Sequence, residues 1–261
     1  MGNLIEPYEP KILLFDIETA PILAHVWGIW DQNVGLNMIE SDWHILSFSA
    51  KWLGKDEIIY FDQRNCKDIE NDKQILRHLW KMMDAADVIV GHNLDKFDIK
   101  KVNTRFLLHG MKPPSDYRTI DTLKIARQKF AFTSNKLEHL ADKLKLASQK
   151  SKHKEFPGFE LWKHCLAGNI KAWKEMEAYN KMDVIVLEAV YTALIPWYNK
   201  INFSTFAQGL LCQCGSTDFR RHGHMFTNGG KYQRMRCRKC GAMRSLKENL
   251  IDKDVRGIIP K

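Results

Sequence analysis

Residues 11–19 of the chain read KILLFDIET, an apolar run that ends in two acidic residues. Residues 11–17 are rich in strand formers and too few for a helix, so they predict a central strand buried on both faces. Asp16 and Glu18 are two residues apart and therefore point to the same face of the sheet. Two adjacent ionised carboxylates repel each other and resist burial, and a divalent cation would relieve both costs. The alternative is that the strand enters solvent here.

The segments downstream predict a mixed sheet with helices packed on its faces. Two strand-forming runs joined by Gly-Lys-Asp come first, and short strands then alternate with segments of helical apolar spacing. We expect strands at residues 45–53, 57–61, 88–90 and 119–122, and helices at residues 69–83, 96–108, 123–129, 136–146, 160–167 and 170–194.

The composition indicates a globular protein with an uneven charge distribution. The chain has 261 residues, 44% of them hydrophobic, which excludes disorder as its main state. Its apolar stretches are too short for a bilayer span and no signal peptide precedes them, so we expect a reducing cytoplasm and no membrane partner. Residues 200–261 hold 13 Lys and Arg against 4 Asp and Glu, and therefore carry the whole net charge of +9. This excess indicates either a nucleic-acid-binding appendage or a solvated tail.

Three further polar residues lie on predicted helices. Asp98 is in the first turn of the helix after Gly-His-Asn at residues 91–93. Tyr179 and Asp183 are four residues apart and share a helical face with Val186, so that face is expected to pack inward. Taken singly, Asp98 would be an electrostatic helix cap, and Asp183 would be either hydrogen-bonded or at the rim of the core.

Taken together, these segments resemble the DEDD superfamily of 3′→5′ exonucleases, in its tyrosine branch. FDIET resembles the first exonuclease motif, GHNLDKFD the second and YNKMD the third. Residues 10–198 resemble the exonuclease domains allied to B-family DNA polymerases, which implies an RNase H-like fold with a five-stranded mixed sheet. The four metal-binding carboxylates of the family correspond to Asp16, Glu18, Asp98 and Asp183, and the tyrosine that positions the attacking water corresponds to Tyr179. Asp95 competes with Asp98, and the Phe-Asp spacing of the family favours Asp98.

The chemistry of these residue types agrees with the resemblance. Two Mg²⁺ or Mn²⁺ ions can activate a water and stabilise the leaving 3′ oxygen, and such hard cations select carboxylate oxygens. Glu18 would contact metal and water, Asp16 would bridge both ions, and the other two carboxylates would complete the shells. Because a tyrosine has a pKa of about 10, Tyr179 would orient the water rather than deprotonate it.

Four of the six cysteines form two short pairs, Cys212 with Cys214 and Cys237 with Cys240, each followed by Gly. Paired cysteines in a cytosolic protein predict one structural Zn²⁺ held by four thiolates. The segment resembles the zinc ribbons of transposase-type DNA-binding proteins. The first pair departs from that pattern, with one intervening residue in place of two. His222 or His224 could therefore replace a thiolate. Independently of this departure, a pair of disulfides is the other alternative.

The remaining predictions concern the substrate and the domains. Asn93 either holds the terminal nucleotide or caps a helix, and Phe226 and Tyr232 either stack on bases or fill the ribbon core. We expect an exonuclease domain at residues 1–200, a linker at 201–209, a zinc ribbon at 210–246 and a tail at 247–261. The candidate substrate-binding residues are Thr19, Asn93, Lys150, Arg221, Arg234 and Arg236.

The sequence therefore predicts an α/β protein that acts as a metal-dependent 3′→5′ exonuclease on single-stranded 3′ ends of DNA. The zinc ribbon would bind nucleic acid, and replication or recombination proteins are candidate partners. A bacterial or virus-encoded intracellular protein fits this description. The alternatives are an RNA exonuclease, and a nucleic-acid binding or recruitment protein whose nuclease centre is idle.

Overall fold

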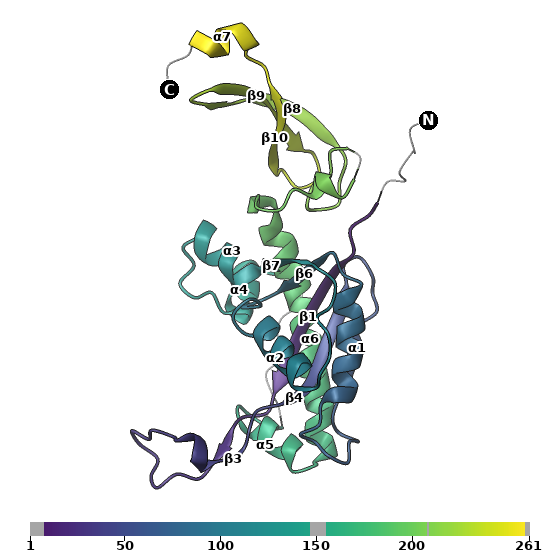
Figure 1. The fold of residues 1–261 in the computed structure, drawn as a ribbon, viewed down its shortest axis with the longest axis vertical. Helices are drawn as coiled ribbons and strands as arrows, with labels where there is room; N and C mark the ends of the chain where they lie inside the picture. Colours follow the sequence, from purple (N-terminus) through teal and green to yellow (C-terminus); the bar gives the residue numbers. More distant parts are fainter. Residues whose placement is uncertain (1–7, 147–154, 208, 259–261) are drawn as a thin grey trace. The chain divides into compact units, whose positions relative to one another are not determined.

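The computed structural model describes residues 8–146, 155–207 and 209–258. The chain divides into two compact units, one formed by Lys11–Tyr191 and the other by Thr192–Lys261 together with Met1–Pro10. Figure 1 shows the elements of both units.

A five-stranded mixed sheet forms the centre of unit Lys11–Tyr191, with the strand order β5-β4-β1-β6-β7. β1 pairs antiparallel with β4 and parallel with β6, β4 pairs antiparallel with β5, and β6 pairs parallel with β7. This arrangement confirms the predicted RNase H-like sheet. The strands are β1 (Ile12–Thr19), β4 (Ile45–Trp52), β5 (Ile59–Asp62), β6 (Val88–Gly91) and β7 (Arg118–Asp121).

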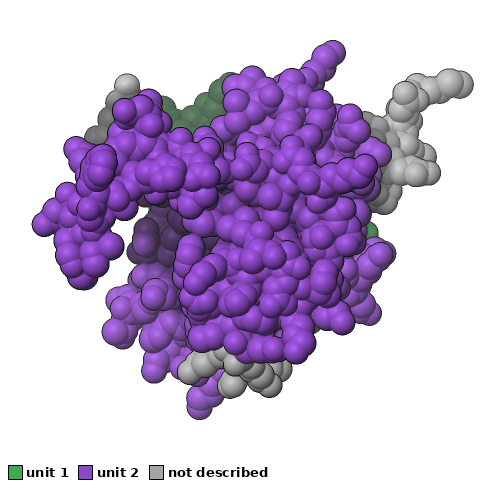
Figure 2. Space-filling model, turned by 90° about the horizontal axis from the view of Figure 1, so that it is seen from below, with its two compact units in different colours: residues 1–10, 192–261 green, residues 11–191 purple. Residues whose placement is uncertain are grey.

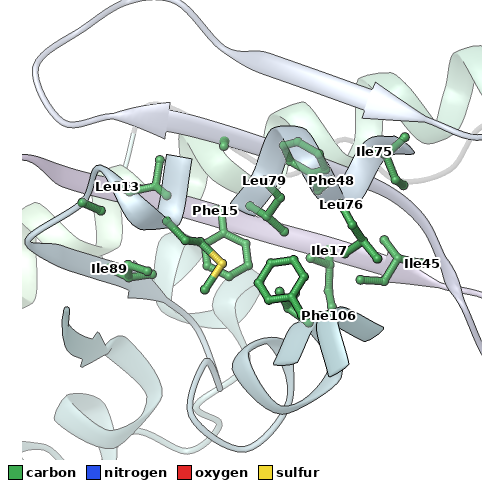
Figure 3. Packing of buried hydrophobic residues seen from close by; sticks show 14 of the residues in the cluster. Leu13, Phe15, Ile17, Ile45, Phe48, Ile75, Leu76, Leu79, Ile89 and Phe106 are labelled. Carbon is green, nitrogen blue, oxygen red and sulfur yellow. The ribbon is translucent and has the colours of Figure 1, made fainter. Parts of the chain in front are cut away.

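Helices cover both faces of this sheet. On one face, α1 (Lys73–Asp84) and α2 (Asp98–Leu108) pack on Leu13, Phe15 and Ile17 of β1 (Figure 3). On the other face, α5 (Glu160–Leu166) and α6 (Ile170–Leu194) contribute Leu161 and Trp173 to a second cluster, which includes Leu46 of β4. The remaining helices of this unit are α3 (Thr122–Lys129) and α4 (Leu137–Lys143).

The alternation of β1 positions the acidic pair. Since Phe15 and Ile17 point toward α1 and α2, the intervening Asp16 and the following Glu18 point toward the opposite face. In the register with β4, Asp16 lies opposite Ser49 and Glu18 opposite Ser47. Lys51, two residues further along β4, forms an ion pair with Glu188 of α6, which places α6 over this same face.

Some boundaries differ from the predicted ones. The helix expected at residues 69–83 begins only at Lys73, because the Asp72 carboxylate is buried and bound to Arg105 at 2.7 Å and to the Ile45 amide at 2.8 Å. The segment between β1 and β4, for which no element was predicted, contains β2 (Leu23–Ala24), the 3₁₀ turn Leu36–Met38 and β3 (Ile39–Ser41). Across the described ranges, each helix is too short or too polar to cross a lipid bilayer.

The second unit contains a three-stranded antiparallel sheet in the order β10-β9-β8. Its strands are β8 (Phe219–Thr227), β9 (Gly230–Cys237) and β10 (Met243–Asn249), and α7 (Lys253–Ile258) follows them. Two 3₁₀ turns, Ile195–Trp197 and Phe203–Thr205, precede the sheet. The hydrophobic cluster of the sheet is small and consists mainly of Cys212, Cys237 and Ala242. Such a core is too small to stabilise the sheet without a crosslink or a metal.

Candidate metal centres

The first candidate metal centre is acidic and joins the two ends of unit Lys11–Tyr191. One carboxylate oxygen each from Asp16, Glu18 and Asp183 lies within 4.8 Å of the others. Glu18 and Asp183 are 9% and 6% exposed, so their charges are largely removed from water. Three carboxylates this close repel one another strongly unless protons or cations neutralise them.

Asn180 holds Asp16 in this cluster. Its side-chain Nδ2 donates a hydrogen bond to Oδ2 of Asp16 at 2.8 Å and reaches the Asp16 carbonyl at 3.4 Å. Asn180 is fully buried on α6, next to Tyr179. Sequence reasoning missed this residue, although its helical spacing of four residues from both Met176 and Val184, which are buried, was a usable signal.

Tyr179 lies beside the same carboxylates. Burial raises its pKa well above the ordinary value for tyrosine, and the charges of Asp183, Glu18 and Asp16 raise it further. The hydroxyl also forms a hydrogen bond with Asp183. Because the phenol stays protonated at neutral pH, Tyr179 can donate and orient but cannot act as a general base there.

Asp98 is the first residue of α2 and is 3% exposed. Burial raises its pKa to about 7, while hydrogen bonds with its own backbone and that of Ile17 lower it, and the charge of Asp121 raises it. The Ile17 contact places Asp98 next to the stretch of β1 that carries Asp16 and Glu18. Asp98 itself is outside the group of three carboxylates within 4.8 Å. Asp95, the competing candidate, forms an ion pair with Lys124 at 2.6 Å instead.

These residues fit divalent cations. The donor set consists of carboxylate oxygens, which hard cations such as Mg²⁺ and Mn²⁺ prefer. The buried Oδ1 of Asp98 accepts no hydrogen bond from the part of the chain that the structure describes, so it is available to a ligand. Ser47 and Ser49, on the β4 register positions opposite the acidic pair, are small and buried. A bound cation would reduce the repulsion between these closely spaced carboxylates.

The turn that leads into α2 is held by a second buried carboxylate, Asp121, at the end of β7. Its Oδ1 accepts hydrogen bonds from the backbone amides of Asn93 and Leu123, each at 3.0 Å. Asn93 has a φ of 65°, a left-handed conformation that asparagine tolerates better than most residues. The N-cap residue of α2 is Phe97, not Asn93. The predicted nucleotide contact of Asn93 stays a prediction.

The second candidate metal centre is formed by cysteines. The sulfur atoms of Cys212, Cys214, Cys237 and Cys240 all lie within 4.8 Å of one another. Sγ of Cys212 is 3.5 Å from Sγ of Cys240, and Sγ of Cys214 is 3.7 Å from Sγ of Cys237. All four are free thiols, which excludes the disulfide alternative in this structure. Neither His222 nor His224 joins this group of described metal-ligand atoms.

The two cysteine pairs form similar turns although the first is one residue shorter. The carbonyl of Cys212 accepts a hydrogen bond from Gly215 at 2.9 Å, and that of Cys237 accepts one from Gly241 at 3.0 Å. Both glycines have a positive φ, at 79° and 77°, a conformation that glycine adopts without strain. Burial opposes ionisation of the Cys237 thiol, but hydrogen bonds with the backbone of Cys240 and Lys239 lower its pKa to about 7. Burial instead raises the pKa of Cys212 and Cys214, and a bound zinc ion would hold the sulfurs as thiolates.

The basic residues beside the cysteines form a concave surface. A depression of about 510 Å³ is lined by Arg220, Arg236 and Arg238 together with Cys237 and Gly241. Arg221 and Arg234 are exposed on β8 and β9, and Arg221 is opposite Met235 in the ladder. Thr19 ends β1 opposite Ile45. Lys150 lies outside the described residues.

The RNase H superfamily model matches residues 35–195. The chain belongs to the RNase H superfamily. The matched range covers more than half of the chain and includes Asp98, Tyr179 and Asp183, whereas Asp16 and Glu18 precede it and the four clustered cysteines follow it. Membership of this superfamily supports a hydrolase of nucleic acid that uses bound metal.

One solved structure with the same RNase H-like fold is the family B DNA polymerase from the hyperthermophilic archaeon Pyrobaculum calidifontis. It aligns with a TM-score of 0.54 at 14% sequence identity, over 72% of this chain and 25% of the polymerase chain. At that identity the likeness concerns the fold alone, and the match spans a quarter of the polymerase. No curated protein matches the sequence.

Proposed function

We propose that this RNase H superfamily protein is a 3′→5′ exonuclease of the DEDD type, in its tyrosine branch, and that it trims single-stranded 3′ ends of DNA. The observation that carries the proposal is the convergence of Asp16, Glu18 and Asp183 within 4.8 Å, with Tyr179 hydrogen-bonded to the same cluster. A structural role alone does not require three near-contact carboxylates and a buried tyrosine in one place.

Asp16, Glu18, Asp98 and Asp183 would hold two Mg²⁺ or Mn²⁺ ions. When bound, such ions lower the pKa of a water and stabilise the leaving oxygen of a phosphodiester. The contribution of Asn180 is to orient Asp16, because its amide holds one carboxylate oxygen at 2.8 Å. Tyr179 would align the attacking water through its hydroxyl group, which keeps its proton because its pKa is raised.

The second unit would use its four cysteines for one structural Zn²⁺. Structural zinc contributes about 10–16 kcal/mol to the folding of comparable peptides, which is enough to order a sheet with so small a hydrophobic cluster. The arginine-lined depression, with Arg220, Arg236 and Arg238, would bind phosphates of the nucleic acid. We therefore assign residues 1–200 to the nuclease, 201–209 to a linker, 210–246 to the ribbon and 247–261 to a tail.

End-labelled oligonucleotides test this function directly. Single-stranded DNA, duplex DNA and RNA of one sequence are incubated side by side with Mg²⁺, with Mn²⁺ or with EDTA. We expect a 5′-labelled DNA strand to shorten stepwise, a 3′-labelled strand to release its label at once, and EDTA to stop both. Faster loss of RNA would identify an RNA exonuclease, and cleavage inside a circular strand would identify an endonuclease.

Two variants accompany this assay. Asp16→Ala should abolish cleavage without loss of the fold, because it removes one member of a mutually repelling cluster. Glu138→Ala changes an exposed acidic residue on α4 and should cleave like the wild type. Metal-dependent cleavage by Asp16→Ala at near wild-type rate would show that this cluster is not the active site.

A further inference from the structure

Residues 20–44 form an arm between β1 and β4. The arm leaves the sheet directly after Thr19 and returns at Ile45, and its root is closed by a hydrogen bond from the Ala20 amide to the His44 carbonyl at 2.8 Å. Within the arm, β2 and β3 pair over Leu23 with Ser41 and Ala24 with Ile39. Figure 1 shows the arm extending away from the sheet at the lower left.

The arm exposes large apolar side chains that a free surface does not favour. Trp27 is 98% exposed, Trp30 is 81%, Ile29 is 83% and Leu36 is 88%. Apolar side chains gathered in this way mark an interaction site rather than ordinary surface. Both tryptophans present their ring faces to solvent. A ligand that binds on them restricts little conformational freedom, because the ring is rigid.

The polar composition of the arm excludes a phosphate-binding surface. Residues 20–44 contain no Lys or Arg, and they carry the acidic residues Asp31, Glu40 and Asp42. They do carry three exposed amides at Gln32, Asn33 and Asn37. Aromatic rings stack on bases of any kind, and amide side chains hydrogen-bond to base edges. Acidic groups repel phosphates, so a strand on this surface would turn its bases inward and its backbone outward.

The position of the arm connects it to the acidic cluster. Thr19, at its root, follows Glu18 directly, and Ser47, opposite Glu18 on β4, lies two residues beyond the other root at Ile45. Seen from the end of the sheet where the arm leaves, the unit has a projection on the side of the arm and a hollow between this projection and the body (Figure 2). A strand whose terminal linkage reaches the carboxylates would therefore lie beside the root of the arm.

We propose that the arm binds unpaired bases of the nucleic-acid strand whose end lies at the acidic cluster, with Trp27 and Trp30 as stacking platforms. This inference rests on the proposed function, because it assigns the substrate of that site. The substrate class that follows is a strand with several unpaired bases next to its 3′ end. Recognition by the arm depends on the bases and not on the phosphates.

The test uses the full-length chain and a labelled single-stranded DNA in EDTA, so that binding is measured without cleavage. The Trp27→Ala, Trp30→Ala double variant should bind at least about 10-fold more weakly, since stacking on one aromatic ring already accounts for this much. This loss of affinity relative to the wild type should vanish on a strand of equal length whose bases are replaced by abasic units. The slope of log affinity against log salt should not change, because no cation of the arm is involved.

Matched variants separate stacking from other contacts. The Trp27→Phe, Trp30→Phe pair keeps aromatic faces and should retain most of the affinity, whereas the Trp27→Leu, Trp30→Leu pair should behave like the alanine pair. Leu107→Ala removes an apolar side chain that is 78% exposed on α2, outside the arm, and should bind like the wild type.

Three outcomes would overturn the inference. Equal affinity of the alanine pair and the wild type would mean that the arm faces another macromolecule, and sedimentation would then show whether it is a second copy of the chain. Wild-type affinity of the leucine pair would exclude stacking. A deficit that persists on the abasic strand would exclude the bases. Failure of the proposed function is a separate result, namely no metal-dependent cleavage while the base-dependent deficit remains.

Discussion

The hydroxyl of Tyr179 keeps its proton at neutral pH and is a hydrogen-bond donor, because burial and three carboxylates hold its pKa above the ordinary range. Tyr179→Phe removes this donor and leaves every carboxylate in place. We expect kcat to fall roughly 100-fold with little change in KM, the cost of one preorganised hydrogen-bond donor in a transition state. Single-turnover cleavage of labelled DNA measures this effect.

Tyr117→Phe is the control for Tyr179→Phe, since it removes a half-buried hydroxyl outside the cluster. An unchanged kcat in Tyr179→Phe would make Tyr179 a packing residue that contacts Trp162, whose ring centroid lies 6.2 Å away.

The buried carboxyl group of Asp98 should make the stability of the metal-free protein depend on pH. Burial raises its pKa from 3.8 to about 7, so the folded chain keeps a proton that the unfolded chain releases. Stability from this group is therefore lost as pH rises from about 4 to 7, and above 7 the fold must bury a charge. Asp98→Asn should raise the melting temperature in EDTA by several degrees at pH 8 and hardly at all at pH 4.

Divalent cations should reverse this difference between Asp98→Asn and the wild type. Mg²⁺ neutralises the buried carboxylate and should raise the melting temperature of the wild type more than that of the variant. A variant that is destabilised at pH 8 in EDTA, or that gains as much from Mg²⁺ as the wild type, would contradict this account of Asp98.

The elements that carry the second exonuclease-like motif depend on a single carboxylate from a neighbouring strand. Asp121, at the end of β7, holds the turn before α2 through Asn93 and caps α3 through Leu123. Asp121→Ala leaves buried amides without an acceptor, which should lower the free energy of unfolding by about 1–3 kcal/mol. Urea unfolding measures this loss, and Mg²⁺ affinity should fall as well because the turn positions Asp98.

Asp121→Asn provides the control, since it keeps one acceptor oxygen and should lose less stability than the alanine variant. If both variants unfolded at the wild-type urea concentration, the hydrogen bonds of Asp121 would not be what joins β7 to α2.

For the whole molecule, the uneven charge predicts that the unit with the cysteines contributes to phosphate binding and the other unit to cleavage. Changing Arg220, Arg236 and Arg238 to Gln removes the cations of the depression beside the cysteines. On single strands the slope of log affinity against log salt should shrink by about 0.7 for each phosphate that the protein no longer neutralises. Titration of one oligonucleotide at several salt concentrations measures this change in slope. Mg²⁺-dependent cleavage at saturating DNA concentrations should persist.

A second triple variant controls for net charge. In the full-length chain, three exposed residues of unit Lys11–Tyr191 are changed to Gln, namely Lys55, Arg77 and Lys81. Equal slopes for the two triple variants would show that the ribbon adds only general charge. An unchanged slope in the arginine variant of the depression would favour a ribbon that docks on protein.

The strands and the sharing of one face by Asp16 and Glu18 could be predicted from the sequence, because both depend on local regularities. A strand of alternating or uniformly apolar residues fixes which side chains point together, whatever surrounds it. The same holds for Tyr179 and Asp183 on one turn of α6. The glycine that closes each cysteine pair is likewise a local signal, and the two turns form with φ values of 79° and 77°.

Features that depend on contacts between distant segments could not be predicted. The start of α1 is set by Arg105, 33 residues away from Asp72, and Asp16 is oriented by Asn180, 164 residues away. The exposure of the arm could not be predicted either, because its apolar residues taken alone indicate a buried segment. Periodicity along the chain specifies which side chains share a face, but only packing decides which faces meet and which stay in solvent.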